Sequence, residues 1–446
     1  MDKVKGKGRL GSIESRPNTW PLIGSIDLDR QSKSLLLSNQ QPEVFEAEIL
    51  RVLQCKLDGS LRKNMSQPTI SIVGAGIGGL TLGRCLLQRG IRAVLYEKAS
   101  SSPRHTYAIT LQPSSYRPLL KALNVDEATF KARVAVDAGI GGSGNINSEG
   151  YGYRNLEPAS FRAHRGSFEE LLREGLDVRW EHSLKSVNLQ DGLQLQFDNG
   201  QTATTNVVVD AEGPHSVVRR QFLTPANPDV LPYVAFNGKR RVPRDAFGKL
   251  YAPTFDNTTV IEVRQDDAVL NISINEATQE QVSISWIYSR PARGSSDPLH
   301  KPNRPNSGAK DIPEDFFTEV AALKDLSQPF ADVFDAEKLR GERILHWLMR
   351  SILVPKNELQ HQSERGIWVM GDAAHAEQII GGGGANGAIE DGVSLAEWIV
   401  QKGTADLRGW YEDRYVSWQA GHEKSRESIT VIHGEQETVS KPQQRL

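Results

Sequence analysis

The segment that most constrains the fold is a glycine pattern that follows a predicted buried strand at Thr69–Val73. Gly74, Gly76 and Gly79 have the spacing G-x-G-x-x-G and lead into a helical pattern. Gly74 permits the tight turn, Gly76 permits close approach of a pyrophosphate, and Gly79 permits the helix to pack on the strand. Glu97 ends the next predicted strand, where its carboxylate can bind the hydroxyls of an adenosine ribose. The pattern predicts a Rossmann-like α/β domain that binds a dinucleotide.

A second glycine-rich segment, Gly371–Gly392, follows an apolar run that is predicted as a strand. Ligands of open α/β sheets bind at the carboxyl ends of strands, and there Asp372 can accept a hydrogen bond from a ribityl hydroxyl. Glycines 381 to 384 let the backbone approach a ligand, and the helix that begins near Ala385 directs its positive end at the negative charge of a reduced isoalloxazine. These features indicate a flavin; the alternative is an ordinary strand, glycine turn and helix.

Two other segments could contact such a cofactor. A short strand predicted at Ala108–Leu111 could pass along the flavin edge, although a plain connection explains the same residues. Phe168 and Leu172 share one face of a predicted helix, with Arg165 at the amino-terminal end of that stripe. Its guanidinium could reach a phosphate or a flavin oxygen, and the alternative is an exposed surface arginine.

The composition argues against several classes of function. Lysine and arginine total 53 and aspartate and glutamate total 55, so the net charge of −2 offers no electrostatic basis for binding nucleic acid or an anionic membrane. We find no apolar run long enough to span a bilayer and no apolar signal-peptide segment at the start of the chain. Cys55 and Cys85 are too few for a disulfide framework and belong to no metal-ligand cluster. We expect a cytoplasmic protein that acts on a small molecule and has no metal site.

Together these motifs resemble the group A FAD-dependent monooxygenases, the para-hydroxybenzoate hydroxylase type, in the form found in fungal secondary metabolism. The resemblance covers about residues 68–400. It rests on four motifs in the family's order: GAGIGG at Gly74–Gly79 with Glu97, the Arg165 pattern, the Glu212-Gly213 turn, and GDAAH at Gly371–His375 with Asn386.

The resemblance implies a role for each matching residue. Glu97 would bind the adenosine ribose of FAD. Arg165 and Asp372 would contact FAD through their side chains. Ala108 and Ala385 would contact it through their backbones.

The resemblance also implies an oxidoreductase that uses FAD, with NADPH or NADH as a transient co-substrate and O2 as the oxygen source. One oxygen atom would enter an aromatic or polyketide-like small molecule through a flavin C4a-hydroperoxide. A flavin-dependent reductase or halogenase of the same fold is the alternative, although Ser285–Tyr288 differs from the halogenase pattern Gly-x-Trp-x-Trp-x-Ile-Pro. A non-catalytic flavin-binding sensor is an alternative of a different class.

Two residues depart from the family's pattern. Glu212 stands where the family usually has Asp, so contacts to FAD or to NADPH could shift. Ile379 stands where the family commonly has Pro, four residues after the histidine of GDAAH. That substitution puts a substrate-orienting role of the loop in doubt.

The predicted architecture is α/β: a Rossmann-like FAD-binding domain of the GR2 type with an inserted, mainly-β substrate domain, as in the para-hydroxybenzoate hydroxylase-like fold. The FAD-binding domain comprises residues 65–224 and 346–425, and the substrate domain comprises residues 225–345. Residues 1–64 are predicted as a polar N-terminal extension and residues 426–446 as a polar C-terminal tail.

In the substrate domain, strands are predicted at Val260–Val263, Ala268–Ile274 and Val282–Tyr288. The last of these strands places Trp286 and Tyr288 on one face, which either packs in the core or walls an aromatic-binding pocket. The proline-rich segment Pro291–Pro313 is predicted as an extended, mobile loop that either gates the pocket or decorates the surface.

The residues assign no catalytic group. Tyr288, His346 and His215 are conceivable bases for a phenol, and packing or a turn hydrogen bond explains each of them equally well. His375, within GDAAH, is expected to have a structural role.

Overall fold

The computed structural model describes residues 70–102, 105–147, 156–189, 192–223, 229–378, 380 and 383–434, all within the compact unit Pro68–Leu446. The predictions for residues 1–64 and for Ile379 lie outside the described residues.

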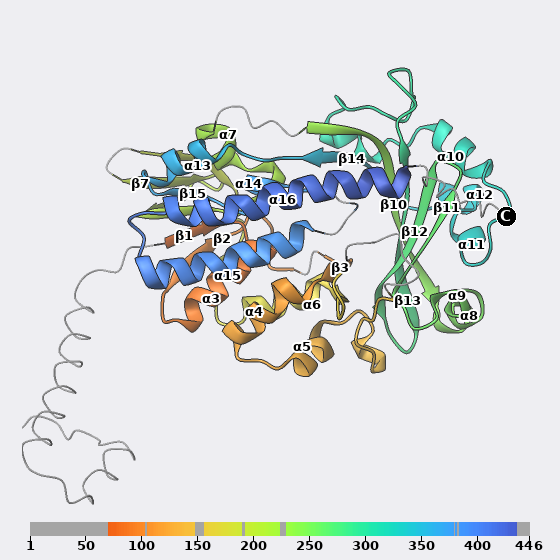
Figure 1. The fold of residues 1–446 in the computed structure, drawn as a ribbon, viewed down its shortest axis with the longest axis horizontal. Helices are drawn as coiled ribbons and strands as arrows, with labels where there is room; N and C mark the ends of the chain where they lie inside the picture. Colours follow the sequence, from red (N-terminus) through yellow and green to blue (C-terminus); the bar gives the residue numbers. More distant parts are fainter. Residues whose placement is uncertain are drawn as a thin grey trace, which may run out of the picture. The chain divides into compact units, whose positions relative to one another are not determined.

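A five-stranded parallel sheet forms the centre of the first half of the fold (Figure 1). Its strand order is β15 (Ile367–Val369), β9 (Val207–Asp210), β1 (Ile70–Val73), β2 (Ala93–Tyr96) and β5 (Asp177–Arg179). All four neighbouring pairs are parallel, as expected for a Rossmann-like domain. The strand at the outer edge, β15, comes from the far end of the chain.

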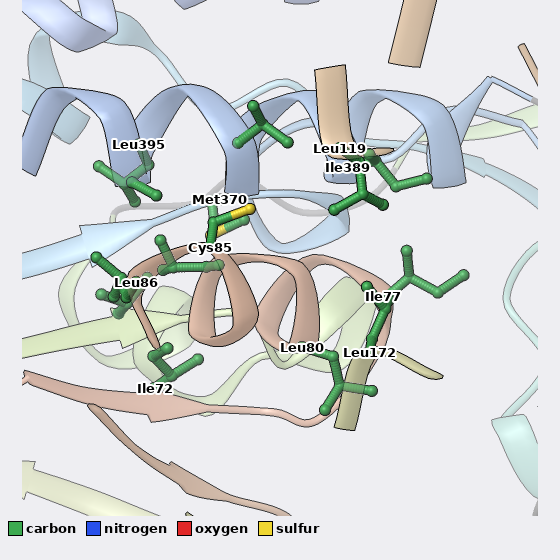
Figure 2. Packing of buried hydrophobic residues seen from close by; sticks show 14 of the residues in the cluster. Ile72, Ile77, Leu80, Cys85, Leu86, Leu119, Leu172, Met370, Ile389 and Leu395 are labelled. Atoms are coloured by element: carbon green, nitrogen blue, oxygen red, sulfur yellow. The ribbon is translucent and has the colours of Figure 1, made fainter. Parts of the chain in front are cut away.

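The two faces of this sheet are covered by different elements. Successive side chains of a strand point to opposite faces, so neighbouring residues of β9 pack against different elements. Val207 and Val209 of β9 belong to the apolar cluster with the helices α3 (Ile77–Gln88) and α15 (Gly384–Lys402). Figure 2 shows α3 between β1 and α15. Val208 points the other way, into the cluster of the three-stranded sheet β6–β8. The bounds of this sheet are β6 (Leu184–Asn188), β7 (Leu193–Phe197) and β8 (Thr202–Thr205).

A five-stranded antiparallel sheet forms the second half. Its order is β11 (Val260–Gln265), β12 (Ala268–Ala277), β13 (Gln281–Pro291), β10 (Asp229–Pro243) and β14 (Ile344–Ser351). The three predicted strands are confirmed with longer bounds, and β10 and β14 are additional. One face packs against the helices α8 (Arg244–Leu250), α9 (Ala252–Phe255), α10 (Glu314–Ala321), α11 (Phe330–Val333) and α12 (Ala336–Arg340).

A two-stranded ribbon joins the two sheets. It consists of β3 (Ala108–Leu111) and β4 (Phe161–His164), which pair antiparallel. Arg162 of β4 donates through Nη2 to Ser273 Oγ of β12 at 3.3 Å, and the N–H of Ala108 donates to Asn275 Oδ1 at 3.1 Å. The ribbon therefore attaches the cofactor-side residues to the antiparallel sheet.

The remaining helices are α4 (Pro113–Leu123), α5 (Glu127–Val134), α6 (Arg165–Arg173), α7 (Val217–Phe222), α13 (Lys356–Ser363), α14 (Asp372–His375) and α16 (Arg408–His433). The last helix, α16, passes residue 426, the predicted start of a polar tail, because Ile429 and Ile432 are buried against the antiparallel sheet. None of the helices in the described residues combines the length and apolar character needed to cross a bilayer.

Candidate functional site

A cavity of about 1000 Å³ lies where the parallel sheet, the ribbon and the antiparallel sheet meet. Seven of the eight predicted cofactor-binding residues line it: Gly74, Gly76, Glu97, Ala108, Arg165, Asp372 and Ala385. Its volume is at the upper end of ordinary ligand sites, which gives it room for a dinucleotide and a second molecule. Gly79, the eighth residue, lies behind the cavity wall.

The three glycines after β1 differ in what surrounds them. A Cβ atom on Gly79 would lie 2.0 Å from the carbonyl oxygen of Gly74, so this glycine allows α3 to pack on the turn. Gly74 has a φ of +105°, and its Cβ would lie 2.3 Å from the carbonyl oxygen of Ala211. A Cβ on Gly76 would meet nothing within 4 Å. Packing therefore requires Gly74 and Gly79, whereas the space above Gly76 is open to a ligand.

Glu97 lies just after β2, and its carboxylate is buried at the edge of the cavity. Oε2 accepts the N–H of Ala75 at 2.8 Å, and Oε1 accepts the N–H of Ala99 at 2.9 Å. A carboxylate has about four acceptor positions, and these two bonds fix the orientation of Glu97 at the cavity edge.

Arg165 and Asp372 come from distant segments and both line the cavity. Arg165 begins α6, where its Nε pairs with Glu169 at 2.8 Å and its guanidinium contacts the Tyr107 hydroxyl. Its side chain is 21% exposed, which argues against a free surface arginine. Asp372 begins α14 after Gly371, which has a φ of +58°. Burial raises the pKa of Asp372, and His375 and Arg165 oppose that shift.

Ala108 and Ala385 differ in how much of their backbone is free for a ligand. The N–H of Ala108 bonds to Asn275, and its carbonyl accepts Arg162 Nη2 at 3.1 Å. Ala385 lies in the first turn of α15, whose N-cap is Gly383, and no side chain in the described residues caps this end. First-turn amides have no acceptor within their helix, so α15 presents a positive end to the cavity.

The acidic turn after β9 closes one end of the cavity. Glu212 Oε2 accepts the backbone N–H groups of Val217 at 2.9 Å and Val218 at 3.3 Å, so it caps α7. Asp210 is fully buried beneath it and accepts the N–H of Glu212 at 3.0 Å. Burial and the neighbouring Glu212 raise the pKa of Asp210 to about 7. The carboxylate of Glu212 therefore bonds to the start of the helix that follows its own turn.

Behind the GDAAH segment, a buried carboxylate fixes the start of α14. Asp391 Oδ2 bonds to His375 Nε2 at 2.6 Å and accepts the N–H of Gly371 at 2.9 Å. Its Oδ1 accepts Arg414 Nη2 at 2.8 Å and Trp418 Nε1 at 2.9 Å. Although burial alone would raise the pKa of Asp391, these partners hold it well below its ordinary value. His375 thus has the structural role expected of it.

The antiparallel sheet contributes the opposite wall of the cavity. The face that lines the cavity is not the face of Trp286 and Tyr288, which the pocket interpretation required. Trp286 and Tyr288 lie on the core face, where they donate to Glu342 Oε2 at 2.9 Å and Glu319 Oε2 at 2.8 Å. Their interpretation as a pocket wall is wrong, because α10 and its neighbours cover that face. Ser285 and Ile287 line the cavity instead.

Sequence reasoning did not identify the cavity residues of β10, β12 and β14. They are Asn237, Gly238, Lys239, Asn271, Ser273, Leu345 and Trp347, with Arg343 just before β14. Alternation of polar and apolar residues was the available signal, but β10 and β14 were not predicted as strands. Burial and the nearby Arg343 lower the pKa of Lys239.

The three conceivable bases lie elsewhere. Tyr288 is on the core face, and His346 stacks on Phe236 there at 4.5 Å between ring centroids. His215 lies exposed in the turn before α7. The described residues that line the cavity include none of them.

The proline-rich segment is anchored and contributes no described residue to the cavity. Arg290 Nη1 pairs with Asp297 Oδ2 at 2.6 Å, and both side chains are buried. Leu299 is fully buried in the core of the substrate half. These contacts anchor the segment at Asp297 and Leu299, and the absence of its described residues from the cavity lining argues against the gate.

Comparison with known proteins agrees with this geometry. The profile of the FAD binding domain family matches residues 67–416. The chain is 31% identical over 390 residues to the FAD-dependent monooxygenase vrtH of Penicillium aethiopicum, covering 83% of this chain and 94% of vrtH. It is 32% identical over 392 residues to the FAD-dependent monooxygenase nscC of Aspergillus fumigatus, covering 82% and 96%.

Solved structures share the fold. The structure of 2,6-dihydroxypyridine-3-hydroxylase from Arthrobacter nicotinovorans superposes with a TM-score of 0.61 at 19% identity. The match covers 84% of this chain and 96% of that enzyme.

Proposed function

The chain belongs to the FAD binding domain family and is an FAD-dependent monooxygenase, and we propose that it uses NADPH or NADH and O2 to oxygenate an aromatic or polyketide-like small molecule. The observation that carries the proposal is a single cavity bounded by the dinucleotide motif on one side and the polar face of the antiparallel sheet on the other. The wall that carries the dinucleotide motif can hold FAD, and the wall formed by the antiparallel sheet can hold the substrate.

The residues of the first wall fit FAD. Gly76 leaves space that a Cβ would fill, and Glu97 presents a fixed carboxylate beside it. Arg165 offers a guanidinium for a phosphate or a flavin oxygen, and Asp372 offers a carboxylate for a ribityl hydroxyl. The first turn of α15 would stabilise negative charge on the flavin. When bound, FAD supplies the oxygen-transfer chemistry after reduction by NAD(P)H.

The second wall supports the substrate class. Asn271, Ser273 and Ser285 contribute amide and hydroxyl groups to this wall, and Ile287 and Trp347 contribute apolar side chains. Such a wall can pack against a flat ring and satisfy its hydroxyl or carbonyl groups. These residues would orient the substrate and exclude water while the cofactor reacts.

The cysteine content supports the proposed compartment. The chain has two cysteines, and Cys85 is a free, buried thiol. This usage is typical of a reducing environment, and we place the enzyme in the cytoplasm.

The test is a reaction of FAD-loaded protein under ¹⁸O2 with a panel of phenols and hydroxylated polyketides. Anaerobic mixing with NADPH or NADH should bleach the flavin, and admission of oxygen should yield a product that carries one ¹⁸O atom. A reduced product without ¹⁸O would indicate a reductase. A flavin that neither nicotinamide reduces would refute the nicotinamide dependence.

A further inference from the structure

We propose that Glu377 is an acid–base group of this enzyme, which transfers a proton between the substrate in the large cavity and solvent in a second cavity. The proposal rests on the oxygenase function proposed above, and it adds a residue that the sequence analysis did not single out.

The second cavity has a volume of about 410 Å³ and lies between the start of α15 and the helix α16. Gln112, Leu156 and Glu377 line both cavities. Of these three residues, Glu377 is the one whose side chain titrates. It therefore stands where a proton could pass from one space to the other.

Two glycines leave room for the Glu377 carboxylate. A Cβ atom on Gly383 would lie 2.0 Å from Oε2, and a Cβ on Gly421 would lie 2.7 Å from Oε1. Gly383 is the N-cap of α15, and Gly421 lies within α16. The carboxylate thus lies at the same helix end that faces the expected flavin. A Cβ on the neighbouring Gly384 would lie 3.2 Å from Asp372 Oδ1, so both carboxylates border this helix end.

The carboxylate of Glu377 is free to exchange a proton. In the described part of the chain, no hydrogen bond or ion pair holds it, in contrast to Asp391, which bonds to donors of four residues. Burial raises its pKa, Asp372 and Glu390 raise it further, and His375 and Lys424 oppose them. A carboxylate whose pKa is shifted toward neutrality is suited to general acid–base work.

The proposed reaction begins with a phenolic or enolic hydroxyl of the substrate. Its O–H bond breaks, the electron pair stays on the substrate oxygen, and the proton bonds to a Glu377 carboxylate oxygen. The extra electron density activates the ring for oxygen transfer. Glu377 then releases its proton to water in the second cavity or returns it to the product oxygen.

Two histidines, His105 and His182, also line the large cavity, and the ring of His182 is held by the carbonyl oxygen of Trp180 at 2.6 Å and by Gln201 Oε1 at 3.0 Å. His105 lines the large cavity, but its Nε2 lies 3.9 Å from Glu169, and the second cavity does not include it. His105→Gln is therefore the matched test of the alternative base.

The primary variant is Glu377→Gln, compared with Glu427→Gln, whose side chain is exposed and lines the second cavity alone. We expect Glu377→Gln to bind FAD and to be reduced by NADPH at the unaltered rate. Its single-turnover oxygen transfer should fall about 100-fold, and the acidic limb of the pH profile should disappear. Glu427→Gln should match the unmodified enzyme. An unchanged profile in Glu377→Gln, or loss of the same limb in His105→Gln alone, would overturn the proposal.

A second readout needs no turnover. Infrared difference spectra of the FAD-loaded protein, recorded against Glu377→Gln between about pH 4 and 9, should show a protonated carboxyl band that titrates above the ordinary range of about 4.3. Gly421→Ala should displace the carboxylate and move this midpoint without removing a charge. A midpoint at the ordinary value would refute the assignment, whether or not the oxygenase function holds.

Discussion

Trp286 and Ile287 are consecutive residues of β13, yet they face opposite sides of the antiparallel sheet. Trp286 is fully buried in the core beneath α10, and Ile287 lines the large cavity. The Trp286→Ala variant should lose about 3–5 kcal/mol of unfolding free energy, because a large side chain leaves a cavity. The Ile287→Ala variant should keep most of its stability and raise the KM for substrate about tenfold. Chemical denaturation and steady-state kinetics separate the two effects, and a KM effect confined to Trp286→Ala would contradict the assignment of faces.

Gly76→Ala and Gly79→Ala should fail in different ways. A methyl group on Gly76 would meet no protein atom within 4 Å. The free energy of unfolding of the Gly76→Ala apoprotein should therefore differ from that of the unmodified apoprotein by no more than about 0.5 kcal/mol. The same methyl group would occupy the space expected for the pyrophosphate, and FAD affinity should fall more than about tenfold. Gly79→Ala places its methyl group against the Gly74 carbonyl and should destabilise the apoprotein itself. Thermal unfolding and flavin fluorescence titration distinguish these outcomes.

Asp391→Asn should destabilise the fold by about 3 kcal/mol, because it removes one partner of a buried ion pair and leaves the Arg414 charge less well compensated. Glu423→Gln, at an exposed position of α16, is the control and should have little effect. The stabilisation from Asp391 is present above its ordinary pKa of about 3.9 and is lost as the pH falls toward its depressed folded pKa. Urea unfolding at neutral pH measures the difference, and equal stability of the two variants would argue against this role.

His346 should make the fold sensitive to mild acid. Burial and the nearby Arg304 lower the pKa of His346 to about 4, whereas an unfolded histidine titrates near 6.5. As the pH falls from about 6.5 to 4, the unfolded chain gains a proton that the folded chain does not, so the unfolding free energy decreases by at most about 3 kcal/mol. Above about pH 6.5 the effect is absent. His346→Phe preserves the stack on Phe236 and should flatten this part of the stability profile; an identical profile would refute the assignment.

The sequence was most informative where structure is local. Gly74, Gly79 and Glu97 lie within one strand–turn–helix–strand unit, so their spacing alone indicated their places. Asp372 and Arg165 are far apart in the sequence. They could be placed in the same cavity because the family resemblance implies that both contact FAD.

Other parts of the site depend on contacts that no local pattern reports. Lys239 and Trp347 reach the cavity because β10 lies between β13 and β14, a pairing of segments about 100 residues apart along the chain. The stripe at Trp286 and Tyr288 was ambiguous because alternation identifies two faces without saying which one the helices cover. Glu377 was overlooked because its position depends on space that Gly383 and Gly421 create from two different helices.

The place of β15 at the edge of the parallel sheet has a consequence for biogenesis. Until residues 367–369 leave the ribosome, β9 has an open hydrogen-bonding edge, and its apolar residues Val207–Val209 are all destined for the interior. The entire substrate sheet is synthesised during that interval. Unpaired apolar edges promote association between chains, so the nascent polypeptide is prone to association throughout this interval. Because α15 also completes the cavity, FAD can stabilise the protein only after most of the chain has been made.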